Sequence, residues 1–135
     1  MIGIVVVTHG QLATELLNAA EMIVGDFPQC AAVSIRSHEG TDGVREKIAQ
    51  AIARVQQGHG VLVVTDMFGG TPSKLAMTFL GRDDVEVVTG VNLPMLIALA
   101  GRSEQASLLE VARETRERGR DAMWVASDLL RGDQT

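Results

Sequence analysis

Cysteine, aromatic residues and long apolar runs are scarce in this sequence, and each scarcity excludes a class of protein. The single cysteine, Cys30, cannot form an intramolecular disulfide or a multi-cysteine zinc or iron–sulfur site. The aromatic residues are 3 Phe and 1 Trp, with no Tyr, which argues against base-stacking platforms and carbohydrate-stacking clefts. No apolar run approaches the length of about 18 residues that a membrane-spanning helix needs. The sequence therefore predicts no direct membrane insertion.

The charge balance excludes a further class of partner. The 135 residues carry 12 Lys and Arg against 17 Asp and Glu, so the net charge is −5 with neutral His. An acidic chain binds phosphate backbones poorly, and we therefore expect no nucleic-acid partner. The N-terminus has no basic segment ahead of its first apolar run, so we expect no secretory signal and a cytoplasmic protein.

Apolar segments of two kinds alternate along roughly the first 100 residues, a length that suits one domain. Short β-branched runs predict strands that are buried on both faces, at residues 2–7, 31–35, 61–64 and 85–88. Apolar residues at helical spacing between these runs predict helices. This alternation predicts an α/β fold: a three-layer, open, mainly parallel sheet in the flavodoxin-like order 2-1-3-4, with helices on both faces.

The C-terminal part of the chain departs from this alternation. We expect a short helix over residues 94–100 and then a longer charged helix that Ser103 caps. The apolar residues 123–126 predict a last short antiparallel strand, which must pair with an edge of its own sheet or of a second copy. We therefore take residues 1–127 as a single domain and residues 128–135 as a polar tail.

Polar and glycine-rich segments follow three of the predicted strands. They are Thr8-His9-Gly10, Thr65-Asp66-Met67-Phe68-Gly69-Gly70-Thr71-Pro72 and Thr89-Gly90-Val91-Asn92-Leu93-Pro94. Because the carboxyl ends of parallel strands share one edge, where ligands of such sheets bind, we expect the functional site there. The first segment lacks the acidic residues of a response-regulator receiver, and neither a P-loop nor a dinucleotide-binding glycine pattern is present.

A histidine and an aspartate in these segments predict the chemistry. If the first and third strands are neighbours, Asp66 can accept a hydrogen bond from His9 Nδ1–H, which leaves Nε2 as the exposed nucleophile. Gly69 and Gly70 let backbone N–H groups approach an anion, and Thr71 adds a hydroxyl donor at a helix start. This set favours phosphoryl transfer through a phosphohistidine. No second carboxylate adjoins Asp66, so we expect no metal and no other cofactor.

These residues resemble a known family. The three segments are similar to the IIA domain of the mannose/fructose-type sugar phosphotransferase system, and the likeness covers nearly the whole chain. The resemblance implies that His9 is the phosphorylated residue of a phosphotransferase, that Asp66 orients it, and that Thr71 helps to hold the phosphoryl group. The phosphocarrier HPr would be the donor, charged from phosphoenolpyruvate through enzyme I, and a IIB component the acceptor. Family members are homodimers that exchange their last strand, which would account for residues 123–126.

Other residues of the three segments are expected to support the site loops rather than to react. They are Thr8, Gly10, Phe68, Pro72, Asn92 and Pro94. One position departs from the family pattern, because Lys74 stands where relatives commonly carry Asn.

Three other functions are compatible with the same residues. A stand-alone regulatory module would use phosphorylation of His9 to switch the binding of a protein partner, without an acceptor in sugar transport. A small-molecule hydrolase using His9 and Asp66 is a weaker alternative, because the sequence offers no separate nucleophile or metal set. A dihydroxyacetone-kinase phosphotransfer subunit shares the general fold, but residues 69–72 favour the mannose-type branch.

Overall fold

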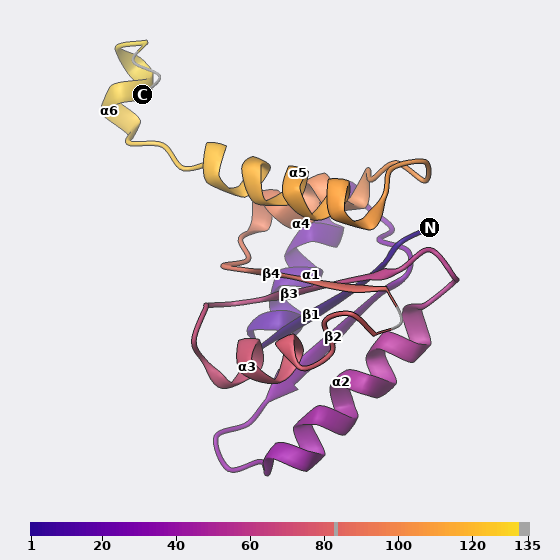
Figure 1. The fold of residues 1–135 in the computed structure, drawn as a ribbon. Coiled ribbons are helices and arrows are strands. Elements are labelled where there is room, and N and C mark those ends of the chain that lie inside the picture. Colours follow the sequence, from indigo (N-terminus) through magenta and orange to yellow (C-terminus); the bar gives the residue numbers. More distant parts are fainter. Residues whose placement is uncertain (83, 133–135) are drawn as a thin grey trace.

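The computed structural model describes residues 1–82 and 84–132, which form a helix–sheet–helix arrangement in three layers (Figure 1). The sheet has the predicted order β2-β1-β3-β4, and all its strand pairs are parallel. Its strands are β1 (Gly3–His9), β2 (Cys30–Ile35), β3 (Val61–Thr65) and β4 (Val85–Thr89). In this register His9 lies opposite Ile35 of β2, and Val7 lies opposite Thr65 of β3. The carboxyl ends of the strands therefore meet at one edge.

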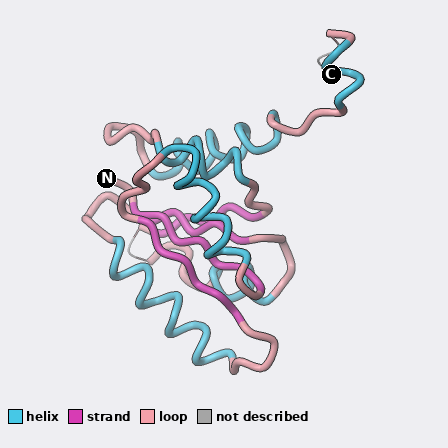
Figure 2. The backbone as a smooth tube through the Cα atoms, turned by 180° about the vertical axis from the view of Figure 1, so that it is seen from behind, coloured by secondary structure: helices cyan, strands magenta, loops and turns pink. Residues whose placement is uncertain are grey.

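Helices cover both faces of the sheet, and the tube seen from behind shows the same layers (Figure 2). One face is covered by α1 (Leu12–Val24), α4 (Leu93–Ala100) and α5 (Leu108–Asp121). The other face is covered by α2 (Thr41–Val55) and α3 (Thr71–Met77). No helix within the described ranges is long and apolar enough to cross a bilayer.

The two central strands are buried on both faces. Side chains alternate along a strand, so Val5 and Val7 of β1 join the core under α2, whereas Ile4 and Val6 join the core under α1 and α4. β3 alternates in the same way and is buried along its whole length. This burial explains the unbroken β-branched runs in the sequence. The residues that follow these strands are therefore held on the most rigid part of the fold.

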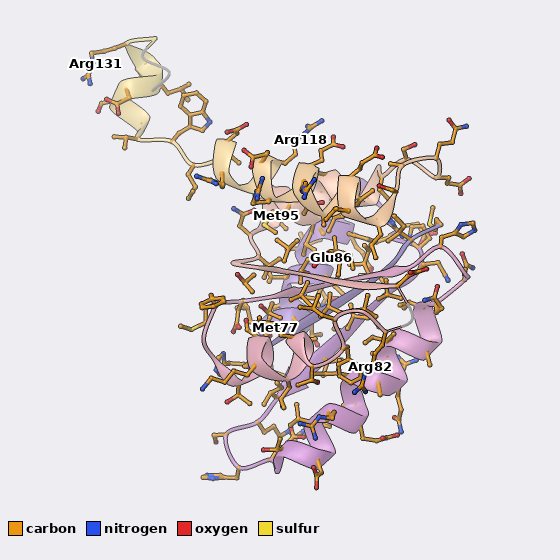
Figure 3. All side chains as sticks on the ribbon, viewed as in Figure 1. Met77, Arg82, Glu86, Met95, Arg118 and Arg131 are labelled. Atoms are coloured by element: carbon orange, nitrogen blue, oxygen red, sulfur yellow. The ribbon has the colours of Figure 1, made fainter. Side chains whose placement is uncertain are left out.

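The last strand expected at residues 123–126 is not formed. α5 leads the chain away from the sheet, residues 123–125 adopt no regular structure, and a short helix, α6 (Ala126–Leu130), lies clear of the body (Figure 1). Residues 123–132 together form a C-terminal arm, and Figure 3 shows Arg131 at its far end. A strand needs a partner edge, and the path of α5 brings residues 123–125 to none within the single chain. α6 also takes up part of the expected polar tail, of which residues 133–135 lie outside the described residues.

α5 begins four residues later than expected. Its N-cap is Ser107, whose Oγ accepts a hydrogen bond from the backbone N–H of Glu110 at 3.2 Å and donates to Glu110 Oε1 at 3.1 Å. Ser103 lies in the preceding loop, where its Oγ accepts from the N–H of Gln105. Ser107 is the N-cap, and Glu110 holds its hydroxyl in place with both the backbone N–H and the carboxylate.

Arg102 joins three separate parts of the chain at the opposite edge of the sheet. Its side chain is buried, with Nε donating to the carbonyl of Ile2 at 2.7 Å. Nη1 donates to the carbonyl of Leu99 at 2.8 Å, and Nη2 to the carbonyl of Pro28 at 3.1 Å. The guanidinium carbon also lies 5.9 Å from the centre of the Phe27 ring. One side chain therefore ties the start of β1 to the end of α4 and to the segment before β2.

Replacing Arg102 by methionine should lower the free energy of unfolding by about 1–3 kcal/mol, because the buried carbonyl group of Ile2 loses its donor. Urea denaturation followed by circular dichroism measures this change. Arg118→Met on the exposed face of α5 is the control, and its effect should stay within about 0.5 kcal/mol. Equal stabilities of the two variants would show that Arg102 contributes nothing beyond its apolar stem.

Candidate active site

His9 and Asp66 meet at the carboxyl edge of the sheet. His9 is the last residue of β1, and Asp66 directly follows β3. His9 Nδ1 lies 2.8 Å from Asp66 Oδ2, and this hydrogen bond is the contact that the sequence predicts. The His9 side chain is 53 % exposed, whereas that of Asp66 is 13 % exposed. The arrangement presents the imidazole to solvent and keeps its carboxylate partner beneath it.

The surroundings of Asp66 determine where the proton of the His9 ring lies. Oδ2 also accepts the backbone N–H of His9 at 3.0 Å, and Oδ1 accepts that of Met67 at 3.0 Å. Burial alone raises the pKa of Asp66, but the hydrogen bonds from His9 and Met67 outweigh it and lower this pKa below its ordinary value of 3.8. Asp66 is therefore an ionised acceptor at neutral pH, so Nδ1 carries the proton. In the neutral ring, Nε2 then keeps a free lone pair.

Gly70 brings the backbone close to the reactive edge of the imidazole. A Cβ atom at Gly70 would lie 2.9 Å from His9 Cε1 and 3.5 Å from Nε2. The preceding residue, Gly69, has a φ of +89°, a conformation that side chains rarely allow. The two glycines of the predicted cradle are therefore required for different reasons, one for conformation and the other for space.

α3 starts beside His9, because its N-cap Gly70 is the residue close to the imidazole. Gly70 is the N-cap, Thr71 is the exposed first residue, and Pro72 is buried in the first turn. The first backbone hydrogen bond of the helix runs from Lys74 N–H to the Gly70 carbonyl at 3.0 Å. The N–H groups of Thr71 and Ser73 precede it and have no acceptor within the helix. An anion on His9 Nε2 would therefore lie near amide donors.

Two buried hydroxyl groups, which the sequence alone did not single out, hold the loop after β3. Ser73 Oγ donates to the Met67 carbonyl, and Thr65 Oγ1 lies 2.6 Å from Ser73 Oγ. Since a serine has one hydroxyl proton, Thr65 is the donor of the second bond. The brace therefore fixes the residues on both sides of Asp66. The only signal in the sequence is that Thr65 is the one hydroxyl residue in the otherwise apolar strand β3.

The structure also places the other predicted residues of the first and second segments, Thr8, Gly10 and Phe68. Thr8 is buried, and its Oγ1 accepts the N–H of Ala13 at 2.7 Å, which fixes the start of α1. Gly10 has a φ of +55° and donates its N–H to the Ile35 carbonyl at 2.8 Å. Phe68 is 72 % exposed in the loop after β3. Thr8 and Gly10 thus support the turn that carries His9, while Phe68 lies exposed in the loop between Asp66 and Gly69.

Asn92 and Pro94, of the third segment, lie at the start of α4. Asn92 is the N-cap of α4, where its Oδ1 accepts the N–H of Met95 at 3.1 Å and its Nδ2 donates to the Gly119 carbonyl at 3.0 Å. Figure 3 shows Met95 between the sheet and α5. Pro94 is exposed in the first turn of α4. Both residues therefore shape the junction of α4, and Asn92 joins it to α5. Residues 1–82 and 84–132 contain no cluster of three or more candidate metal ligands.

Comparison with known proteins shows which family combines this fold with these residues. A family model described as the "PTS system fructose IIA component" (EIIA-man) matches residues 3–115. The chain belongs to the EIIA-man family. It is thus a phosphotransfer component of EIIA type in the phosphotransferase system of sugar uptake.

Named relatives agree with this placement. The fructose-specific EIIA component of Bacillus subtilis (strain 168) is 30% identical over 131 residues, which are 96% of this chain and 90% of that protein. The mannose-specific EIIAB component of Escherichia coli (strain K12) is 32% identical over 124 residues, which are 90% of this EIIA but 38% of that protein. Among solved structures, the mannose/sorbose-specific IIA subunit of Enterococcus faecalis has a TM-score of 0.83 at 31% identity, with 92% of this chain and 93% of that chain covered.

Gly70→Ala should displace the His9 ring, because the new methyl group would lie within 2.9 Å of Cε1. We expect the hydrogen bond between Nδ1 and Asp66 to lengthen or break, which ¹⁵N-detected NMR of the imidazole nitrogens measures through the loss of a single tautomer. Gly40→Ala is the matched control, since a Cβ atom there meets nothing within 4 Å. Identical His9 spectra in the wild type and Gly70→Ala would contradict the close approach.

Proposed function

We propose that this EIIA is a phosphocarrier whose His9 accepts a phosphoryl group from phospho-HPr and passes it to a IIB component. The proposal depends on one observation, the 2.8 Å hydrogen bond from His9 Nδ1 to Asp66. That bond leaves Nε2 unprotonated beside the Gly70 backbone, where a nucleophile is needed. We expect the exchange to take place in the cytoplasm, as family membership implies.

The transfer step needs only the lone pair of Nε2. In the first transfer this lone pair attacks phosphorus, a bond from Nε2 to phosphorus forms, and the bond from phosphorus to the donor atom breaks. The electron pair of that bond stays with the donor. The proton on Nδ1 remains in its hydrogen bond to Asp66. In the second transfer the nucleophile of the acceptor attacks phosphorus, and the electron pair returns to Nε2.

Asp66 and the start of α3 would stabilise opposite charges during this exchange. As Nε2 bonds to phosphorus the ring becomes more positive, and the adjacent carboxylate of Asp66 stabilises that charge. The phosphoryl oxygens would accept hydrogen bonds from the amides near Gly70 and from the Thr71 hydroxyl. These groups position the phosphoryl group and neutralise its charge, which is the main requirement for catalysing its transfer.

The surroundings of His9 suit a protein partner. Met67 and Phe68, in the loop beside it, are 55 % and 72 % exposed, and large apolar side chains are typical of the centres of protein interfaces. The half-exposed His9 ring is accessible to a donor or acceptor atom on another protein. These features favour transfer between macromolecules over hydrolysis of a small ester.

Incubation with enzyme I, HPr and phosphoenolpyruvate should add one acid-labile phosphoryl group, detected by intact mass. His9→Ala should abolish this gain, because no other group carries the nucleophilic lone pair at the site. Asp66→Asn should leave the fold intact and slow the transfer roughly 10–100-fold, because the ring loses the partner that selects its tautomer.

His59→Ala is the matched control, because His59 is exposed and precedes β3 at the opposite edge of the sheet. The His59→Ala variant should gain one phosphoryl group, as the wild type does. Labelling of His9→Ala at the wild-type level would reject the assignment of His9, and unchanged rates in Asp66→Asn would remove Asp66 from the mechanism. Rapid onward transfer to a IIB component distinguishes the transport role from a purely regulatory one.

We also propose that two copies associate through the C-terminal arm. Residues 123–125 are apolar and exposed, with Trp124 49 % exposed. The outer edge of β4 has no partner strand among the described residues, and a groove of about 310 Å³ runs between this strand and α5, with Leu109 in its lining. The arm of one copy placed on the β4 edge of another would cover both surfaces. This arrangement supplies the partner edge that a single chain lacks.

Trp124→Ala should weaken this association, because it removes the largest apolar side chain of the arm. Sedimentation velocity over a dilution series should show monomers at concentrations where the wild type is dimeric. Met22→Ala removes an apolar side chain that is still more exposed, from α1, and should leave the sedimentation unchanged. A wild type that stays monomeric at every concentration would reject the dimer.

A further inference from the structure

β2 forms the other edge of the sheet. Ile4 N–H donates to the Gln29 carbonyl and Gly10 N–H donates to the Ile35 carbonyl, so the odd-numbered residues of this segment pair with β1. The N–H and C=O groups of one residue in a strand point to the same side, and those of the next residue point to the other side. The N–H and C=O groups of Ala32 and Ser34 therefore point outward. These groups form an open ladder that an additional strand could join.

A groove of about 300 Å³ runs along this open edge. Its walls come from β2, from the stripe of α2 that faces it, and from the residue before α1. The lining residues are Gln11, Ala32, Val33, Ser34, Arg36, Lys47, Gln50, Ala51 and Arg54. In α2, Gln50 and Ala51 lie three and four residues after Lys47, and Arg54 lies four and three residues after them, so all of these residues share one helix face. The groove is thus bounded by a sheet edge and by one line of polar side chains.

The charges that line this groove are all positive. Arg36, Lys47 and Arg54 contribute cations, and no carboxylate belongs to the lining. Lys47 pairs with Glu39 outside it, whereas none of the ion pairs found among the described residues involves Arg36 or Arg54. The chain as a whole carries a net charge of −5, so a positive groove on it is a local exception. Such a groove attracts anions selectively.

We propose that the β2 groove docks an extended acidic segment of a partner protein, which adds to the sheet beside β2. The backbone of the segment would pair with Ala32 and Ser34, and carboxylates at alternate positions would face the cations of Arg36 and Arg54. Strand addition supplies affinity through the backbone, and charge complementarity selects the acidic sequence. The proposal is independent of His9 chemistry and uses the edge of the sheet opposite to β4.

Binding of synthetic peptides tests this proposal directly. The probe is a fluorescein-labelled octapeptide of alternating glutamate and valine, with an alternating lysine–valine octapeptide as its charge-reversed control. Fluorescence anisotropy at low salt should show binding of the acidic peptide alone, which weakens as salt is raised. The double variant Arg36→Glu/Arg54→Glu should weaken this binding about tenfold or more.

A matched double variant controls for the change in net charge. Arg82→Glu/Arg118→Glu alters the net charge equally at two residues outside the groove, both labelled in Figure 3, and should bind like the wild type. Amide NMR of the complex should show the largest shifts and slowed hydrogen exchange at Ala32 and Ser34. Equal affinity for both peptides, equal affinity of both variants, or shifts confined to another strand would overturn the proposal.

The alternative role for Arg36 and Arg54 is to protect the open edge of β2 from pairing with other strands. Charged side chains beside an open strand hinder its pairing with other copies. If the acidic peptide does not bind and Arg36→Gln/Arg54→Gln self-associates, then these residues keep β2 unpaired and the docking proposal is wrong.

Discussion

The hydrogen bond from His9 Nδ1 to Asp66 selects which imidazole nitrogen carries the proton, and the proposed phosphoryl transfer depends on it. The bond is possible only because β1 and β3 are neighbours whose carboxyl ends reach the same edge. Both strands are buried on both faces, so the residues after them have little freedom to move apart. Asp66 is itself held by the backbone N–H groups of His9 and Met67, which keep it ionised.

The fold and this central pair could be predicted because their signals are local. β-branched runs buried on both faces indicate a parallel sheet, and the order 2-1-3-4 places His9 next to Asp66. The close approach of Gly70 and the brace of Thr65 and Ser73 could not be deduced in the same way. They depend on how α3 packs against β3, which the spacing of residues along the chain does not encode.

The errors at the C-terminus have a different cause. Residues 123–126 have the composition of a strand, but composition cannot supply the partner edge that makes an apolar segment a strand. Ser103 and Ser107 are both good capping residues, and the decision depended on Glu110, which only Ser107 can engage. Arg102 shows the same limit, since its three carbonyl partners come from distant parts of the sequence.

The Asp66 carboxylate accepts both the ring and the backbone N–H of His9, so the imidazole is tethered at one end and offers a single nitrogen. That nitrogen has the Gly70 backbone close by on one flank, and the ring is otherwise half exposed to solvent. In the proposed mechanism, the protein that delivers the phosphoryl group and the protein that removes it both approach this exposed side of the ring. In that mechanism the donor protein and the acceptor protein exclude each other, so the transfer proceeds by alternate encounters rather than through a three-protein complex.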